Sequence, residues 1–191
     1  AFILCLLAFL VLINFNYFTI FLALASMPLA FTYPLMKRYT YWPQLFLGIT
    51  FNYGLILGWT SIQGQLDIVP IIFYFGAIFW TLGYDTIYGY QDIKDDEIIG
   101  LKSTSIKFKG NPKIFLTICY LTLVFALTIG GYLMNFNIIY FLFLLFPLLH
   151  LFQFQIKNFK SNNSSTCLRL FKSNNFLGLI IFVNILIGKI I

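Results

Sequence analysis

Five of the six acidic residues of this chain lie within one short segment: Asp85, Asp92, Asp95, Asp96 and Glu97. A helix through this segment would bring Asp92 and Asp96 to one face, about 6 Å apart. Asp85 and Tyr88 would lie on the same face, one to three turns earlier. Two carboxylates this close repel each other unless a cation lies between them or one is protonated. Mg²⁺ typically uses one or two carboxylates together with substrate phosphates, so the spacing predicts a Mg²⁺ site at Asp92 and Asp96.

The rest of the acidic segment has a simpler alternative, which is a solvated loop. This alternative suits Asp95 and Glu97 as well as a functional one does. Asp85 differs because it follows a long apolar run. A carboxylate inside a membrane is costly and is by default a functional hypothesis. We therefore expect Asp85 to belong to the site.

Basic residues accompany the acidic segment. Lys37 and Arg38 close an earlier apolar run that includes Tyr33, and Lys102 follows the acidic residues. Cations beside a metal suit an anion too highly charged for the metal alone, such as a diphosphate. The alternative is ordinary enrichment of basic residues on the cytoplasmic side, which needs no site. We prefer it for Lys157, Lys160, Arg169 and Lys172.

The composition requires a membrane around these residues. Of the 191 residues, 60% are hydrophobic and only 9% are charged, whereas soluble domains have about 25% charged residues. Mean hydropathy is +0.89. No soluble fold could hide this much apolar surface. We expect an integral membrane protein whose partners include the lipid bilayer and do not include nucleic acid.

Seven apolar runs are candidates for membrane-spanning helices, and together they predict an all-α polytopic bundle in a single membrane domain, 1–191. Residues 157–173 are expected to be a polar connection, and residues 91–111 a loop. The runs are roughly 1–13, 18–36, 43–60, 68–90, 112–133, 137–156 and 174–191.

The distribution of Lys and Arg predicts the orientation. Eleven of the twelve lie on alternate connections, on one side of the predicted bundle, and only Lys189 falls on the other. The positive-inside rule places the eleven, and loop 91–111, in the cytoplasm, with residue 191 outside. We expect the bacterial inner membrane, or the mitochondrial inner membrane if the source is eukaryotic, with the active side cytoplasmic.

Four segments resemble the UbiA family of aromatic prenyltransferases, in particular the branch that acts on 4-hydroxybenzoate. Residues 33–44 are similar to its Tyr-x-x-x-Lys region, and residues 84–96 and 99–104 to its second aspartate-rich motif. Residues 174–178 are similar to the start of its last helix. The resemblance implies a bundle of nine helices around a central cavity, of which this chain would hold the third to the ninth.

The resemblance also implies an activity, which is Mg²⁺-dependent transfer of a polyprenyl group from polyprenyl diphosphate to the ring of 4-hydroxybenzoate in ubiquinone biosynthesis. Asp92 and Asp96 would hold the metal, and Lys37 would contact the diphosphate, so these three are the expected catalytic residues. The remaining residues expected to bind diphosphate or substrate are Tyr33, Arg38, Asp85, Tyr88 and Lys102.

The family's first aspartate-rich motif, Asn-x-x-x-Asp-x-x-x-Asp, does not occur in this sequence. We therefore expect an N-terminal segment supplied in cis or in trans, with an inactive or split fragment of the enzyme as the alternative. A non-enzymatic transporter is a second alternative. Transporters often show inverted repeats and polar groups near the middle of the membrane, and we find neither.

Overall fold

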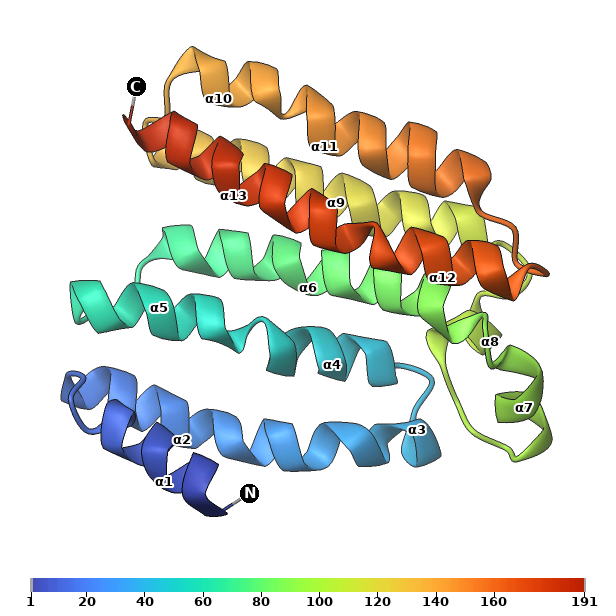
Figure 1. Cartoon of the computed structure of the whole chain (residues 1–191), viewed down its shortest axis with the longest axis horizontal. Coiled ribbons are helices and arrows are strands. Elements are labelled where there is room, and N and C mark those ends of the chain that lie inside the picture. Colours follow the sequence, from blue (N-terminus) through green and yellow to red (C-terminus); the bar gives the residue numbers. More distant parts are fainter. Residues whose placement is uncertain (1, 191) are drawn as a thin grey trace.

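The computed structural model describes residues 2–190, and all the regular structure in this part of the chain is helical (Figure 1). The helices form long rods that run back and forth. The elements are α1 (Phe2–Leu12), α2 (Tyr17–Thr32), the 3₁₀ turn η1 (Tyr33–Leu35), α3 (Met36–Tyr39), α4 (Pro43–Phe51), α5 (Tyr53–Gln63), α6 (Ile68–Gly89), α7 (Ile93–Ile98), α8 (Thr104–Lys107), α9 (Pro112–Leu133), α10 (Ile138–Phe143), α11 (Leu145–Leu149), the π-helix η2 (His150–Ile156), α12 (Ser164–Lys172) and α13 (Asn174–Ile190).

Within residues 2–190, six helical stretches are long and apolar enough to cross a membrane: Tyr17–Tyr39, Pro43–Gln63, Ile68–Gly89, Pro112–Leu133, Ile138–Ile156 and Ser164–Lys189. They correspond to the last six predicted runs, and α1 is the shorter seventh. The predicted runs 43–60, 68–90 and 112–133 begin where helices start, at Pro43, Ile68 and Pro112. The side chain of Asp67 accepts a hydrogen bond from Ile68 N at 2.6 Å.

The predicted polar connection 157–173 is wrong over its second half. Residues 164–172 form α12, which continues almost without a break into α13 (Figure 1). The helix forms because one of its faces is apolar: Cys167 and Leu170 are fully buried, while Arg169 and Lys172 supply basic residues to its last turn. The connection is therefore limited to residues 159–163.

Helix α6 lies in the middle of the bundle and packs along α9. Contact is close because small residues face the partner helix: a Cβ added at Gly76 would come within 2.5 Å of the Cβ of Ala126. A Cβ added at Gly83 would come equally close to the ring of Tyr120. Small residues let helix backbones approach inside a membrane, where dispersion rather than the hydrophobic effect drives helix association. This contact positions α6, which carries Asp85.

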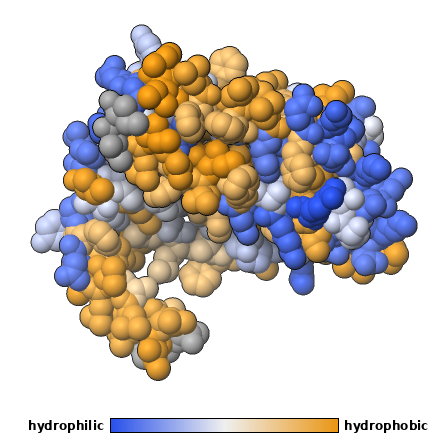
Figure 2. Space-filling model, turned by 45° about the horizontal axis from the view of Figure 1, so that its top comes forward, coloured by the Kyte–Doolittle hydropathy of each residue, from blue (hydrophilic) through white to orange (hydrophobic). Residues whose placement is uncertain are grey.

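Charge and hydropathy divide along the rods. The α3–α4 connection, α7 and α8, and the connection before α12 all lie at one end, the right of Figure 1. Figure 2 shows apolar residues over the middle of the rods and the largest group of hydrophilic residues at this same end. The end is called the basic end below, because the Lys and Arg residues of α3, α7, α8 and α12 lie there.

Candidate functional site

The acidic segment is not a continuation of helix α6, so the single helical face considered for Asp85, Tyr88, Asp92 and Asp96 does not form. Helix α6 ends at Gly89, where α8 packs so closely that a Cβ would clash with Ser105. Asp92 then precedes the separate helix α7, and Asp96 N donates a hydrogen bond to Asp92 O at 2.9 Å. Asp92 and Asp96 are therefore still one helical turn apart, although they belong to a different helix from Asp85.

A cavity of about 190 Å³, called the charged cavity, opens at the basic end. Six of the eight predicted site residues line it. They come from three separate parts of the chain. The lining residues are Tyr33, Pro34, Lys37, Pro43, Gln44, Leu47, Asp85, Tyr88, Gly89, Asp92 and Asp96.

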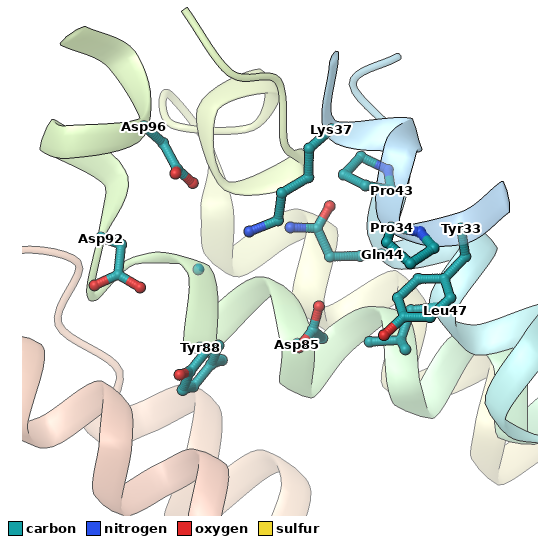
Figure 3. A pocket seen from close by; sticks show the side chains of 11 residues that line it. Tyr33, Pro34, Lys37, Pro43, Gln44, Leu47, Asp85, Tyr88, Asp92 and Asp96 are labelled. Atoms are coloured by element: carbon teal, nitrogen blue, oxygen red, sulfur yellow. The ribbon is translucent and has the colours of Figure 1, made fainter. Parts of the chain in front are cut away.

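Lys37 reaches the cavity because the second rod changes conformation. The 3₁₀ turn Tyr33–Leu35 contains Pro34, whose ring and missing N–H disfavour a continuous α-helix there. Lys37 O then accepts a hydrogen bond from Lys102 N at 2.8 Å, which ties α3 to the loop after α7. Figure 3 shows the Lys37 amine pointing into the space that the Asp92 and Asp96 carboxylates border from the other side.

Arg38 and Lys102, also predicted for the site, do not line this cavity. Lys102 Nζ instead donates to Tyr39 O at 3.2 Å and lies 5.7 Å from the centre of the Tyr41 ring. Lys102 therefore braces the α3–α4 connection. Arg38 is exposed at the same end of the bundle.

Gln44 is a polar residue of the cavity to which sequence reasoning assigned no role. It is only 3% exposed, and its Oε1 accepts a hydrogen bond from Thr104 N at 3.0 Å. Its amide nitrogen points into the cavity beside Lys37 (Figure 3). Thr104 in turn contacts Thr86 of α6, with 2.6 Å between the two hydroxyl oxygens. In the sequence, Gln44 follows Pro43, which starts a helix. This neighbour indicates that Gln44 lies in the first turn of a helix but not that its side chain points into the cavity.

Asp92 and Asp96 form no ion pair with a Lys or Arg side chain among residues 2–190. Among residues 2–190 the only ion pair joins Lys109 to Glu97 at 2.8 Å, and both side chains are exposed, which agrees with a solvated loop around Glu97. Asp96 is only 8% exposed. Burying a carboxylate is costly unless it is paired, so a cation held between the buried Asp96 and the exposed Asp92 would stabilise Asp96.

A metal would find few protein ligands here. In the described part of the chain, no three His, Cys, Asp or Glu side chains come together in a way that could hold a metal ion. Two carboxylates, with the remaining positions filled by water and substrate phosphate, match the way proteins usually bind Mg²⁺. The donor set therefore fits Mg²⁺ bound together with a phosphate-containing ligand.

Two further cavities follow along α6 towards the opposite end of the bundle. The first, the middle cavity, has a volume of about 350 Å³ and a partly polar wall that includes Thr81, Tyr84 and Asn174. The second, the apolar cavity, has a volume of about 430 Å³ and is lined almost wholly by apolar side chains, among them Phe73 and Leu127. Along α6, the charged cavity is thus followed by space suited to a long apolar group.

Comparison with known proteins agrees with this arrangement. The model of the UbiA prenyltransferase family matches residues 1–183. The mitochondrial 4-hydroxybenzoate polyprenyltransferases of Bos taurus and Homo sapiens are 44% and 43% identical over 181 residues, which is 94% of this chain and 48% of each relative. The 4-hydroxybenzoate geranyltransferase 2 of Lithospermum erythrorhizon is 40% identical over 183 residues, or 94% of this chain and 59% of the relative.

The chain spans about half the length of the mammalian relatives it matches. No solved structure matches it significantly. The family model nevertheless covers nearly the whole chain, including all the residues that line the charged cavity. This chain is a member of the UbiA prenyltransferase family.

Proposed function

We propose that this chain carries the prenyl diphosphate site of a membrane enzyme that transfers a polyprenyl group to the ring of 4-hydroxybenzoate, in a Mg²⁺-dependent step of ubiquinone biosynthesis. The observation that carries the proposal is the charged cavity, where Lys37 faces Asp92 and Asp96 and beyond which the cavities become apolar. The relatives' names supply the acceptor.

The charged cavity suits the leaving group. Lys37 donates hydrogen bonds to oxygens of the diphosphate, and such charge-assisted bonds strengthen as the C–O bond breaks and negative charge develops. Asp92 and Asp96 would hold Mg²⁺, which when bound would offset part of the diphosphate charge. Tyr33 and Gln44 complete the polar wall beside Lys37.

Breaking the C–O bond leaves an allylic cation, which the acceptor carbon ortho to the phenol hydroxyl attacks before the ring loses a proton. Asp85 and Tyr88 lie on α6 between the metal pair and the middle cavity, where this acceptor would contact them. Water would trap the cation, so the reaction needs a dry site. The apolar cavity farther along the rods would supply such surroundings.

We also propose that the basic end faces the cytoplasm, or the mitochondrial matrix, and that residues 91–111 lie there. The Lys and Arg residues of α3, α7, α8 and α12, which lie at this end, support the orientation. Residue 191, predicted to face the other side, lies outside the described residues. In a variant without native cysteines, a cysteine at Gln65 should react with a membrane-impermeant thiol reagent outside intact cells. A cysteine at Lys109 should not react, and the reverse pattern would refute this topology.

The function is tested by product formation. The chain is expressed with its native flanking coding sequence in membranes that lack the host's own enzyme, and is supplied with prenyl diphosphate and 4-hydroxybenzoate. We expect prenylated 4-hydroxybenzoate when Mg²⁺ is present and none after chelation. Benzoate, which lacks the activating hydroxyl, serves as the control acceptor. Equal prenylation of 4-hydroxybenzoate and benzoate, or no product from any donor, would refute the proposed reaction.

A further inference from the structure

Trp80 stands where the two inner cavities meet. The middle cavity includes Thr81 and Tyr84 of α6, and the apolar cavity includes Phe73 and Ala77 of the same helix. Only Asn52 and Trp80 line both. An α-helix rises 1.5 Å per residue, so Trp80 lies roughly 8 Å along α6 from Asp85. A chain that extends along α6 from a diphosphate in the charged cavity, through the middle cavity, would meet Trp80 before it reaches the apolar cavity.

The indole ring is held in place by buried hydrogen bonds. Trp80 Nε1 donates to Asn174 Oδ1 at 2.8 Å. The same oxygen accepts from Gln155 Nε2 at 3.0 Å, and Gln155 in turn accepts a hydrogen bond from the hydroxyl of Tyr120. Gln155 and Tyr120 are fully buried. Breaking such a network leaves unpaired polar groups, which is expensive, so the ring keeps its orientation.

The Asn52 side chain, like that of Trp80, is held by hydrogen bonds. Asn52 Nδ2 donates to Thr81 Oγ1 at 2.8 Å and to Ala77 O at 3.2 Å. Both residues shared by the two cavities therefore have set positions. The chemistry of the wall also changes here, from the polar groups of Thr81, Tyr84 and Asn174 to the apolar side chains beyond.

We propose that Trp80 is a specificity-determining residue that sorts prenyl donors by chain length. A short chain ends against the indole ring, whereas a longer chain passes between Trp80 and Asn52 and occupies the apolar cavity. This inference rests on the proposed prenyl transfer. It addresses donor length, for which the relatives' names differ: geranyl in one, polyprenyl in others.

Two substitutions should shift the preference in opposite directions. Trp80→Ala removes the ring on which a short chain ends and widens the passage. The ratio of kcat/KM for a long donor to that for geranyl diphosphate should rise about tenfold, the discrimination that small changes in an apolar pocket give. Gly178→Ala adds a methyl 3.4 Å from the Trp80 ring, an ordinary contact that takes space beside the passage. The ratio should fall.

Phe125→Ala is the matched control, because it removes an aromatic ring that is 68% exposed and lines neither cavity. Its donor ratio should equal that of the unaltered protein. Each variant is measured with geranyl diphosphate and with a donor several isoprene units longer. If the unaltered protein transfers prenyl groups but neither Trp80→Ala nor Gly178→Ala moves the ratio, the role of Trp80 is refuted. If the unaltered protein uses no donor at all, the proposed function fails, and this inference fails with it.

Discussion

Replacing either Asp92 or Asp96 with Asn is expected to lower prenyl transfer by at least about 100-fold at saturating Mg²⁺. A metal at a leaving group is worth several kcal/mol of transition-state stabilisation, and each 1.4 kcal/mol is about tenfold in rate. Asn keeps the size of the side chain but removes the charge that holds the cation. The rate is measured as prenylated 4-hydroxybenzoate formed per unit of enzyme in membranes.

Asp95 provides a matched control on the same short helix. Its side chain lines a separate cavity with Lys94 and Lys109, not the charged cavity. Asp95→Asn therefore removes one charge from α7 without touching the metal pair, and should leave turnover within about twofold. The Asp92 side chain makes no capping hydrogen bond to α7, so its loss should not unfold the helix. Equal activity in the Asp92, Asp95 and Asp96 variants would show that the metal assignment is wrong.

Replacing Lys37 with Met is expected to lower kcat/KM by about 10- to 100-fold, because a hydrogen bond to a charged group contributes about 1.5–3 kcal/mol. Met retains most of the apolar stem and loses only the charged amine. Steady-state kinetics with varied prenyl diphosphate measure the effect, and the affinity for 4-hydroxybenzoate should change less.

Arg38→Met is the control for this substitution. Arg38 is the next residue in α3, is exposed and carries the same charge, but does not line the cavity. Its loss should change kcat/KM only slightly, since a general change in surface charge is screened by salt. Similar losses in both variants would mean that the basic end acts as a diffuse field and that Lys37 has no specific contact.

The membrane-spanning rods could be predicted because their signals are local. A helix in lipid satisfies its backbone polar groups by its own hydrogen bonds, so about 20 apolar residues in a row are sufficient to indicate one. Pro43, Asp67 and Pro112 mark helix starts through the chemistry of the first turn, which also depends only on neighbouring residues.

What the sequence could not show depends on contacts between distant residues. Helix α6 ends at Gly89, where α8 packs against it, and α12 buries Cys167 and Leu170 in the bundle. The Trp80–Asn174 hydrogen bond joins residues 94 positions apart. The same limit applies to Lys37 and Arg38, which are adjacent and equally basic: the family resemblance singled out Lys37, and the cavity shows that Lys37 lines it and Arg38 does not.

The most direct test of the account is the binding of a prenyl diphosphate analogue that cannot lose its diphosphate, measured on the purified protein with and without Mg²⁺. The charged cavity should bind the analogue tightly only when Mg²⁺ is present. This Mg²⁺ dependence should disappear in the Asp92→Asn/Asp96→Asn double variant and persist in Asp95→Asn. Binding that is equally tight without Mg²⁺, or unchanged in the double variant, would contradict the claim that these two carboxylates and a metal hold the diphosphate.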